Sequence, residues 1–193
     1  MYLVDSAGRK AGLAVTACLH EQAAAIAADG YAQFTGNLGG ALVTTGPGGT
    51  NAVTGIAGAW TKSTPLLILS GQVKTADIKA DGQRTRGFQE IDIVSVVRPI
   101  TKYAVTVKEP QMIRYHLEKA VSCARSRRKG PVWLDIPLDV QRAEIDPENL
   151  RGFTPTPDWW ANNISVNVGS ALELLSQSER PVILAGHGIK ASG

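Results

Sequence analysis

Short apolar runs alternate with amphipathic stretches along most of the chain, and this alternation predicts its secondary structure. Runs of strand length, bounded by glycine, proline or polar residues, predict strands at 13–19, 41–45, 65–72, 101–107 and 130–137. Apolar positions at helical spacing predict helices at 21–34, 52–62, 88–99 and 109–127. Strands that alternate with helices indicate an α/β fold with a doubly wound, mostly parallel sheet and helices on both faces.

The two ends of the chain differ from this regular part. Residues 1–12 form a short polar segment, which predicts a loop or a helix remnant. From residue 138 the chain becomes rich in proline and polar residues, which is typical of a linker. We therefore predict a first domain over 1–150, a linker over 151–166 and the truncated start of a second α/β domain over 167–193, with a helix at 170–179 and a strand followed by a glycine turn at 180–188.

Composition and charge exclude several classes of protein. The 193 residues are 44% hydrophobic and 19% charged, as in ordinary globular proteins. The net charge of +3 is too small to favour nucleic acid, and the basic cluster at 125–129 is typical of a solvated helix end. We find neither a signal peptide nor an apolar run long enough to span a bilayer. We therefore expect a cytoplasmic protein with no nucleic acid or membrane partner.

The two cysteines carry no sign of metal chemistry. Cys18 and Cys123 lie in apolar contexts and lack the spacing of metal ligands. Buried free thiols in a reducing compartment are the expected state, and we predict no metal site in this chain. His116 falls in the apolar stripe of the helix at 109–127, which is more typical of a packed histidine than of a ligand.

Glu21 is the first candidate for chemistry. It lies where the predicted strand 13–19 ends and a helix begins, at the kind of sheet edge where α/β folds bind ligands. The helix that follows Glu21, and the helix that follows Gly49, are rich in alanine and glycine. Small side chains allow another helix to approach closely, so we expect these two helices to form a homodimer face.

The second candidate is the glycine-rich turn GPGGTN at 46–51. Glycine permits a sharp turn and close backbone approach to a ligand, Pro47 fixes one φ angle, and the next helix begins with free N–H groups. The dinucleotide pattern GxGxxG is not met, because Asn51 occupies the third glycine position. A tight turn that binds no ligand therefore stays open as an alternative.

Two further segments leave their roles open. GHGIKA at 186–191 fits GxGxxA after a predicted strand, and Lys190 could reach a phosphate or simply be solvated. This segment supports the alternative of a non-catalytic nucleotide-binding or regulatory module. Phe88 and Gln89 end a polar loop, and they line a pocket or only anchor that loop.

The order of the segments is more specific than any one of them. Five segments occur in this order along the chain: HEQAAAIAADGYA, ALVTTGPGGTNAVTGIAGAW, PLLILSGQV, GFQE and GPVWLDIPLDVQ. In this order, over roughly residues 13 to 145, the chain resembles the N-terminal domain of thiamine-diphosphate-dependent enzymes, nearest to the acetolactate synthase group. RPVILAGHG resembles the start of the central domain of that family.

The resemblance implies roles for particular residues. Glu21 is similar to the family's catalytic glutamate, which hydrogen-bonds N1′ of the cofactor's aminopyrimidine. The turn residues match positions at the cofactor, and the loop residues match a substrate pocket; these are Thr45, Gly46, Pro47 and Asn51, and Phe88 and Gln89. The implied substrate is a 2-keto acid, which the enzyme would join to a second molecule as a transferase or decarboxylate as a lyase.

The resemblance also implies parts that this chain lacks. The family has a helix and a strand before the segments quoted, and a C-terminal domain whose GDG…N motif binds Mg²⁺ and the diphosphate. The family's site lies between two subunits, so we expect a homodimer or tetramer and an inactive fragment when this chain is alone. The resemblance leaves FAD open in the full-length protein. We expect burial to raise the pKa of Glu21 only in the assembled dimer, because the helix N-terminus favours the anion.

Overall fold

A four-stranded parallel sheet forms the centre of the chain. The structure is a computed structural model, and it describes residues 2–155 and 164–189. The strands are β1 (Gly39–Val43), β2 (Leu66–Gln72), β3 (Tyr103–Thr106) and β4 (Pro131–Pro137), in the spatial order β1-β2-β4-β3. Each pairing is parallel, so the predicted parallel α/β sheet is confirmed. β1 and β3 are the edge strands. Crossover connections join the parallel strands, as in a doubly wound fold.

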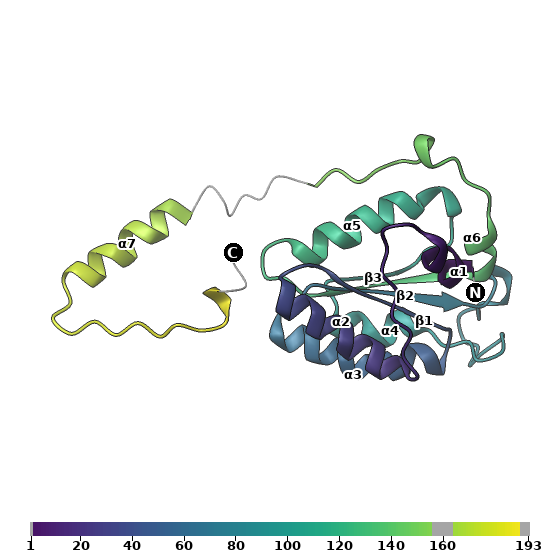
Figure 1. Cartoon of the computed structure of the whole chain (residues 1–193), viewed down its shortest axis with the longest axis horizontal. Helices are drawn as coiled ribbons and strands as arrows, with labels where there is room; N and C mark the ends of the chain where they lie inside the picture. Colours follow the sequence, from purple (N-terminus) through teal and green to yellow (C-terminus); the bar gives the residue numbers. More distant parts are fainter. Residues whose placement is uncertain (1, 156–163, 190–193) are drawn as a thin grey trace. The chain divides into compact units, whose positions relative to one another are not determined.

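Helices cover both faces of this sheet, as predicted (Figure 1). On one face lie α2 (Glu21–Thr35), α3 (Pro47–Lys62) and α4 (Ile93–Val97); α5 (Ile113–Arg125) packs on the other, with α6 (Leu138–Arg142). Residues 2–9 form α1 (Tyr2–Arg9), and short 3-10 turns occupy Thr75–Asp77, Arg98–Ile100, Pro110–Met112 and Pro147–Asn149.

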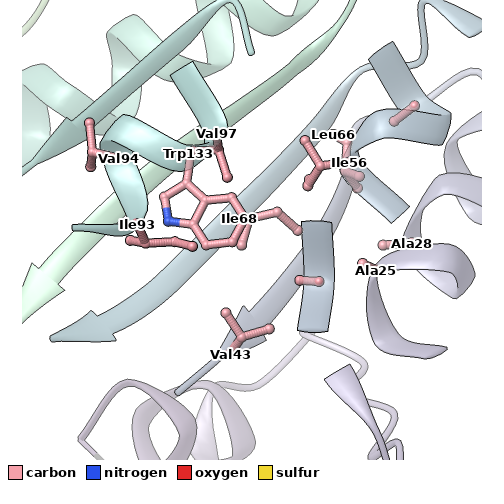
Figure 2. Close-up of a cluster of buried hydrophobic side chains, with 12 residues drawn as sticks. Ala25, Ala28, Val43, Ile56, Leu66, Ile68, Ile93, Val94, Val97 and Trp133 are labelled. Carbon is pink, nitrogen blue, oxygen red and sulfur yellow. The ribbon is translucent and has the colours of Figure 1, made fainter. Parts of the chain in front are cut away.

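The strand β4 supplies side chains to both layers of core, because successive side chains of a strand point to opposite faces of the sheet and β4 lies centrally between β2 and β3. All seven of its residues are buried, which explains why its sequence is a continuous apolar run rather than an alternating one. Figure 2 shows Trp133 of β4 beside the α4 side chains Ile93, Val94 and Val97. On the opposite face, Leu134 and its neighbours in β4 pack with α5.

The small residues of α2 and α3 bring these two helices close together within one chain. An ideal Cβ on Gly55 of α3 would lie 2.6 Å from Cβ of Ala25 in α2. The buried members of the pattern in α2 are Ala25, Ala28 and Ala32. Asp29 of α2 is also buried and forms an ion pair with Lys62 of α3. Part of the small-residue pattern therefore serves contacts inside this chain, and the homodimer face stays a prediction for the rest.

The predicted strand at 13–19 is wrong. This segment has no regular secondary structure, and Leu13, Val15 and Leu19 are exposed. A strand needs a hydrogen-bonding neighbour, and an apolar run alone does not supply one. Glu21 therefore begins a helix without following a strand. The burial predicted for Cys18 is also wrong, because Cys18 is exposed on this segment, while Cys123 is half-buried and both are free.

The chain divides into two compact units, Met1–Phe153 and Thr154–Gly193. In the second unit, the helix predicted at 170–179 is found as α7 (Ile164–Ser176). The strand predicted at 180–188 is wrong, because residues 181–186 have no regular structure and Val182, Ile183 and Leu184 are exposed. Residues 156–163, which are half of the predicted linker, and Lys190 and Ala191 of GHGIKA lie outside the described residues. None of the described helices is long and apolar enough to cross a membrane.

Candidate functional site

Glu21 is held at the first position of α2, next to the start of α3. His20 caps α2, and its Nδ1 accepts a hydrogen bond from the backbone N–H of Gln22 at 3.1 Å. The turn after β1 leads into α3, where Pro47 occupies the first helical turn and needs no hydrogen-bonding N–H. The N-termini of both helices therefore contribute to one site.

Asn51 of α3 contacts Glu21 directly, although 30 residues separate them in sequence. Asn51 Nδ2 donates a hydrogen bond of 3.1 Å to Glu21 Oε2. This bond lowers the pKa of Glu21, and a hydrogen bond from the backbone N–H of Glu21 itself lowers it to a smaller extent. Partial burial acts in the opposite direction but does not outweigh the two bonds. Glu21 is therefore an ionised hydrogen-bond acceptor at neutral pH. Its side chain is half-buried, so part of it is accessible to a ligand.

The glycines of the turn allow the backbone to approach these groups. An ideal Cβ on Gly48 would lie 2.5 Å from Thr44 Cγ2 and 3.2 Å from Glu21 Oε1. Gly46 has a φ of 60° and a ψ of −119°, a conformation that favours glycine. An ideal Cβ on Gly46 would lie 2.1 Å from the carbonyl oxygen of Gln89. A side chain at Gly46 would therefore push the two loops apart.

The loop that carries Phe88 and Gln89 thus lies against the turn. Gln89 has a left-handed φ of 56° and its side chain is exposed. The Phe88 side chain is 84% exposed, and Pro47 is also exposed. The structure brings Glu21 to Asn51 and Gly46 to Gln89, and it leaves the pocket roles of Phe88 and Gln89 as predictions.

The sequence did not predict a buried cluster of hydrogen-bonded polar side chains that contacts the turn. Thr45 Oγ1 donates to Gln72 Oε1 at 3.0 Å, and Gln72 Nε2 donates to Asp135 Oδ2 at 3.0 Å. Burial raises the pKa of Asp135 to about 6, while hydrogen bonds from Ser70, Gln72 and Thr106 act in the opposite direction. The signal was present in the sequence as polar residues near the carboxyl ends of two apolar strands, in LLILSGQ and PVWLDIP.

The fold and the site define a class of protein. The chain contains an α/β domain that presents an ionised carboxylate and a glycine-rich helix N-terminus beside the carboxyl ends of parallel strands. Ligands of open α/β sheets bind at this edge. The bare geometry specifies no ligand, and comparisons with known proteins narrow the class.

Residues 1–96 match the family described as thiamine pyrophosphate enzyme, N-terminal TPP binding domain. The chain is 43% identical over 178 residues to the probable acetolactate synthase large subunit of Methanocaldococcus jannaschii, over 90% of this chain and 29% of that protein. It is 41% identical over 181 residues to the acetolactate synthase isozyme 3 large subunit of Escherichia coli K12, over 90% of this chain and 30% of that protein. The chain thus belongs to this family of N-terminal domains and is acetolactate synthase-like in sequence. It spans about 30% of the length of the curated relatives that it matches.

Proposed function

We propose that this chain supplies the aminopyrimidine-binding part of a thiamine diphosphate site in an enzyme that acts on 2-keto acids. The observation that carries the proposal is the contact of Asn51 with Glu21 beside the glycine turn. The names of the relatives, which are acetolactate synthases, support a reaction that joins or decarboxylates 2-keto acids. The proposed enzyme is accordingly a transferase or a lyase.

The residues present fit the pyrimidine end of this cofactor. Glu21 is ionised and half-buried, so it can accept a hydrogen bond from a ring nitrogen and hold the shared proton. The turn of Thr45, Gly46, Pro47 and Asn51 lies beside the Glu21 carboxylate, since Gly48 carries no Cβ and lets the backbone approach it, and we propose that these turn residues line the ring. Thiamine diphosphate, when bound, supplies the carbon nucleophile and the electron sink of 2-keto acid chemistry. We propose that Phe88 and Gln89 line the pocket for the 2-keto acid.

The remaining parts of the proposal concern the whole enzyme. We propose that Mg²⁺ and the diphosphate are bound by groups outside this chain and that two identical subunits form each site, in a homodimer or tetramer. An exposed stripe on α2, with Ile26, Tyr31 and Phe34, supports self-association. The two free cysteines support a reducing, cytoplasmic location. The resemblance leaves FAD open for the whole enzyme.

The alternative of a nucleotide-binding module requires a strand before the GHGIKA segment. A GxGxxA motif binds phosphate when it follows a strand and opens a helix. Residues 181–186 form no strand, so the motif lacks this context in the part of the chain that the structure describes. We therefore propose only the thiamine diphosphate site.

An NMR titration tests this proposal on the chain itself. Thiamine diphosphate should shift the side-chain amide of Asn51 and the backbone amides of Gly46 and Gly48, with a dissociation constant on the order of 1 mM. The affinity should be weak because this chain offers only the pyrimidine half of the site. Glu21→Ala should abolish these shifts by removing the acceptor.

The controls are a thiazole alcohol without the pyrimidine ring, and ATP. Neither should shift Asn51. Saturable shifts of Asn51 with ATP alone, or cofactor shifts that survive in the Glu21→Ala variant, would contradict the proposal.

A further inference from the structure

Gln72 ends β2 and makes four hydrogen bonds, although it is 7% exposed. Its Oε1 accepts from Thr45 Oγ1 and from the backbone N–H of Val73, each at 3.0 Å. Its Nε2 donates to the carbonyl oxygen of Ile91 and to Asp135 Oδ2, each at 3.0 Å. Two donors and two accepting lone pairs are the full capacity of an amide side chain. Gln72 is therefore completely satisfied.

The chemistry of the partners fixes the orientation of this amide. The Ile91 carbonyl oxygen can only accept, and the Val73 N–H can only donate. A flipped amide would turn its oxygen toward the Ile91 carbonyl and the Asp135 carboxylate and its NH2 group toward the Val73 N–H, and would lose these three bonds. Gln72 therefore has one orientation that satisfies its neighbours.

Two of the three long-range hydrogen bonds of Gln72 reach the two loops of the candidate site. Thr45 precedes Gly46 in the turn that leads to Asn51, and Ile91 follows Gln89 by two residues. These loops also touch each other, because the Gly46 α-carbon faces the Gln89 carbonyl oxygen without room for a Cβ. Gln72 is thus a bridge between the turn of residues 45–51, called here the cofactor turn, and the loop of residues 88–91, called the pocket loop.

Asp135 of β4 holds the bridge from behind. Asp135 is 1% exposed and accepts hydrogen bonds from Ser70 at 2.6 Å, from Gln72 at 3.0 Å and from Thr106 at 3.2 Å. Ser70 in turn accepts a bond of 2.8 Å from Trp133 Nε1, so its own proton is directed to Asp135. The bridge is therefore anchored in three strands of the sheet.

We propose that Gln72, anchored by Asp135, is a positioning residue that holds the cofactor turn and the pocket loop in register. The sheet is the rigid part of the fold, and loops that carry site residues need such a support to keep their geometry. The reading of these loops as a cofactor site rests on the proposed function; the bridge itself rests on the hydrogen bonds alone.

Amide hydrogen exchange, measured by NMR without cofactor, tests the bridge. Three hydrogen-bonded backbone amides report on the loops: Gly48 and Thr50 on the turn, and Glu90 on the pocket loop. Gln72→Met keeps the length of the side chain and removes all four bonds. We expect exchange at the three reporters to become about tenfold faster, since local opening loses one or two hydrogen bonds of ordinary strength.

Two further variants make the test specific. Thr45→Val removes only the bond to the turn, so Gly48 and Thr50 should exchange faster while Glu90 does not change. Gln141→Met is the matched control, because Gln141 is a half-buried glutamine that donates to the Ile136 carbonyl oxygen at 2.7 Å and makes no hydrogen bond to either loop in the described part of the chain. It should leave all three reporters unchanged.

Unchanged reporters in Gln72→Met, or equal acceleration in Gln141→Met, would overturn the proposal. If Gln72→Met does not fold, Thr45→Val decides: unchanged Gly48 and Thr50 rates overturn the bridge. The dissociation constant for thiamine diphosphate should also rise about tenfold in the Gln72→Met or Thr45→Val variant, and an unchanged constant would overturn the positioning role. A wild-type chain that binds no cofactor would instead refute the proposed function, and the exchange rates would still decide on the bridge.

Discussion

At the scale of single residues, the central polar group is a carboxylate that has only neutral hydrogen-bond partners. Asp135 accepts bonds from two hydroxyls and one amide. Desolvation raises its pKa to about 6, and the carboxylate of Asp92 adds to this effect. Asp135 is still mostly ionised at neutral pH, which suits three donors that all point at it. The Asp135 carboxylate thus holds Gln72 through a hydrogen bond, while its desolvation lowers the free energy of unfolding.

This raised pKa predicts a pH dependence with a definite sign. The folded chain keeps the Asp135 proton up to about pH 6, whereas an aspartate normally loses it near 3.8. The folded state therefore binds more protons between these values, and the contribution of Asp135 to the free energy of unfolding falls as pH rises, by at most about 1.4 kcal/mol per pH unit. Urea unfolding of wild type and Asp135→Asn should show that the difference between them falls with at most this slope from pH 4 to 6 and levels off toward pH 7.

Asp139 provides a control of opposite sign. Slight burial raises its pKa, but hydrogen bonds from the Thr75 backbone and hydroxyl outweigh burial and lower it. The contribution of Asp139 to stability is thus lost as pH falls, so Asp139→Asn should not remove the fall between pH 4 and 6. Parallel stability curves for wild type and Asp135→Asn would contradict the assignment.

The sequence predicted the contacting residues of the site better than their support. Glu21 was singled out as a carboxylate at an expected sheet edge and Asn51 as part of the glycine-rich turn, the resemblance implied a cofactor role for both, and the structure brings them into contact. Gln72 and Asp135 were missed, because these two residues lie 63 positions apart along the chain and no local pattern links them. A polar residue at the end of an apolar strand signals a special environment, but only the folded register shows its partners.

At the scale of elements, close contact between α2 and α3 depends on Gly55. Alanine normally stabilises a helix relative to glycine by up to about 1 kcal/mol. At Gly55, however, the added Cβ would lie 2.6 Å from Ala25 Cβ and 3.0 Å from the Ala25 carbonyl carbon, and the backbone cannot yield cheaply. We expect Gly55→Ala to destabilise the chain by about 1–3 kcal/mol, as overpacking does.

Gly30 of α2 is the matched control, because an added Cβ there meets nothing within 4 Å. Gly30→Ala should stabilise the chain by about 0.5–1 kcal/mol. Urea unfolding of both variants measures the two effects. A Gly55→Ala variant as stable as Gly30→Ala would show that the helices are not packed as closely as described.

Elements were predictable where the apolar pattern has a partner in the same chain. β2 and β4 were predicted nearly to the residue because both are central and buried. The segments 13–19 and 181–186 have the same apolar character but form no strand. Strand formation is a property of a pair, so single-sequence patterns cannot decide it. The stripe of alanines was ambiguous for a related reason, since it fits a helix of the same chain or of another subunit.

At the scale of the whole molecule, α2 has two contrasting faces. Ala25, Ala28 and Ala32 face α3 and the sheet and are buried. A second stripe at helical spacing is exposed and consists of small and apolar residues: Ala23, Ile26, Ala27, Gly30, Tyr31 and Phe34. We propose that this exposed apolar stripe is an interaction surface. A second copy of this chain is the occupant that fits the proposed function.

Self-association through this stripe is testable by sedimentation equilibrium. We expect the wild-type chain to form dimers at tens of micromolar, and Phe34→Lys to shift it to monomers, because a charge in an apolar interface costs several-fold to hundred-fold in affinity. Phe34 is 89% exposed in the single chain, so this substitution should not disturb its fold. Val96→Lys introduces the same charge at an exposed apolar residue of α4 and should leave the dimer intact. A monomeric wild-type chain, or dimers equally tolerant of both substitutions, would exclude α2 as the interface, and the exposed stripe would then require a different partner.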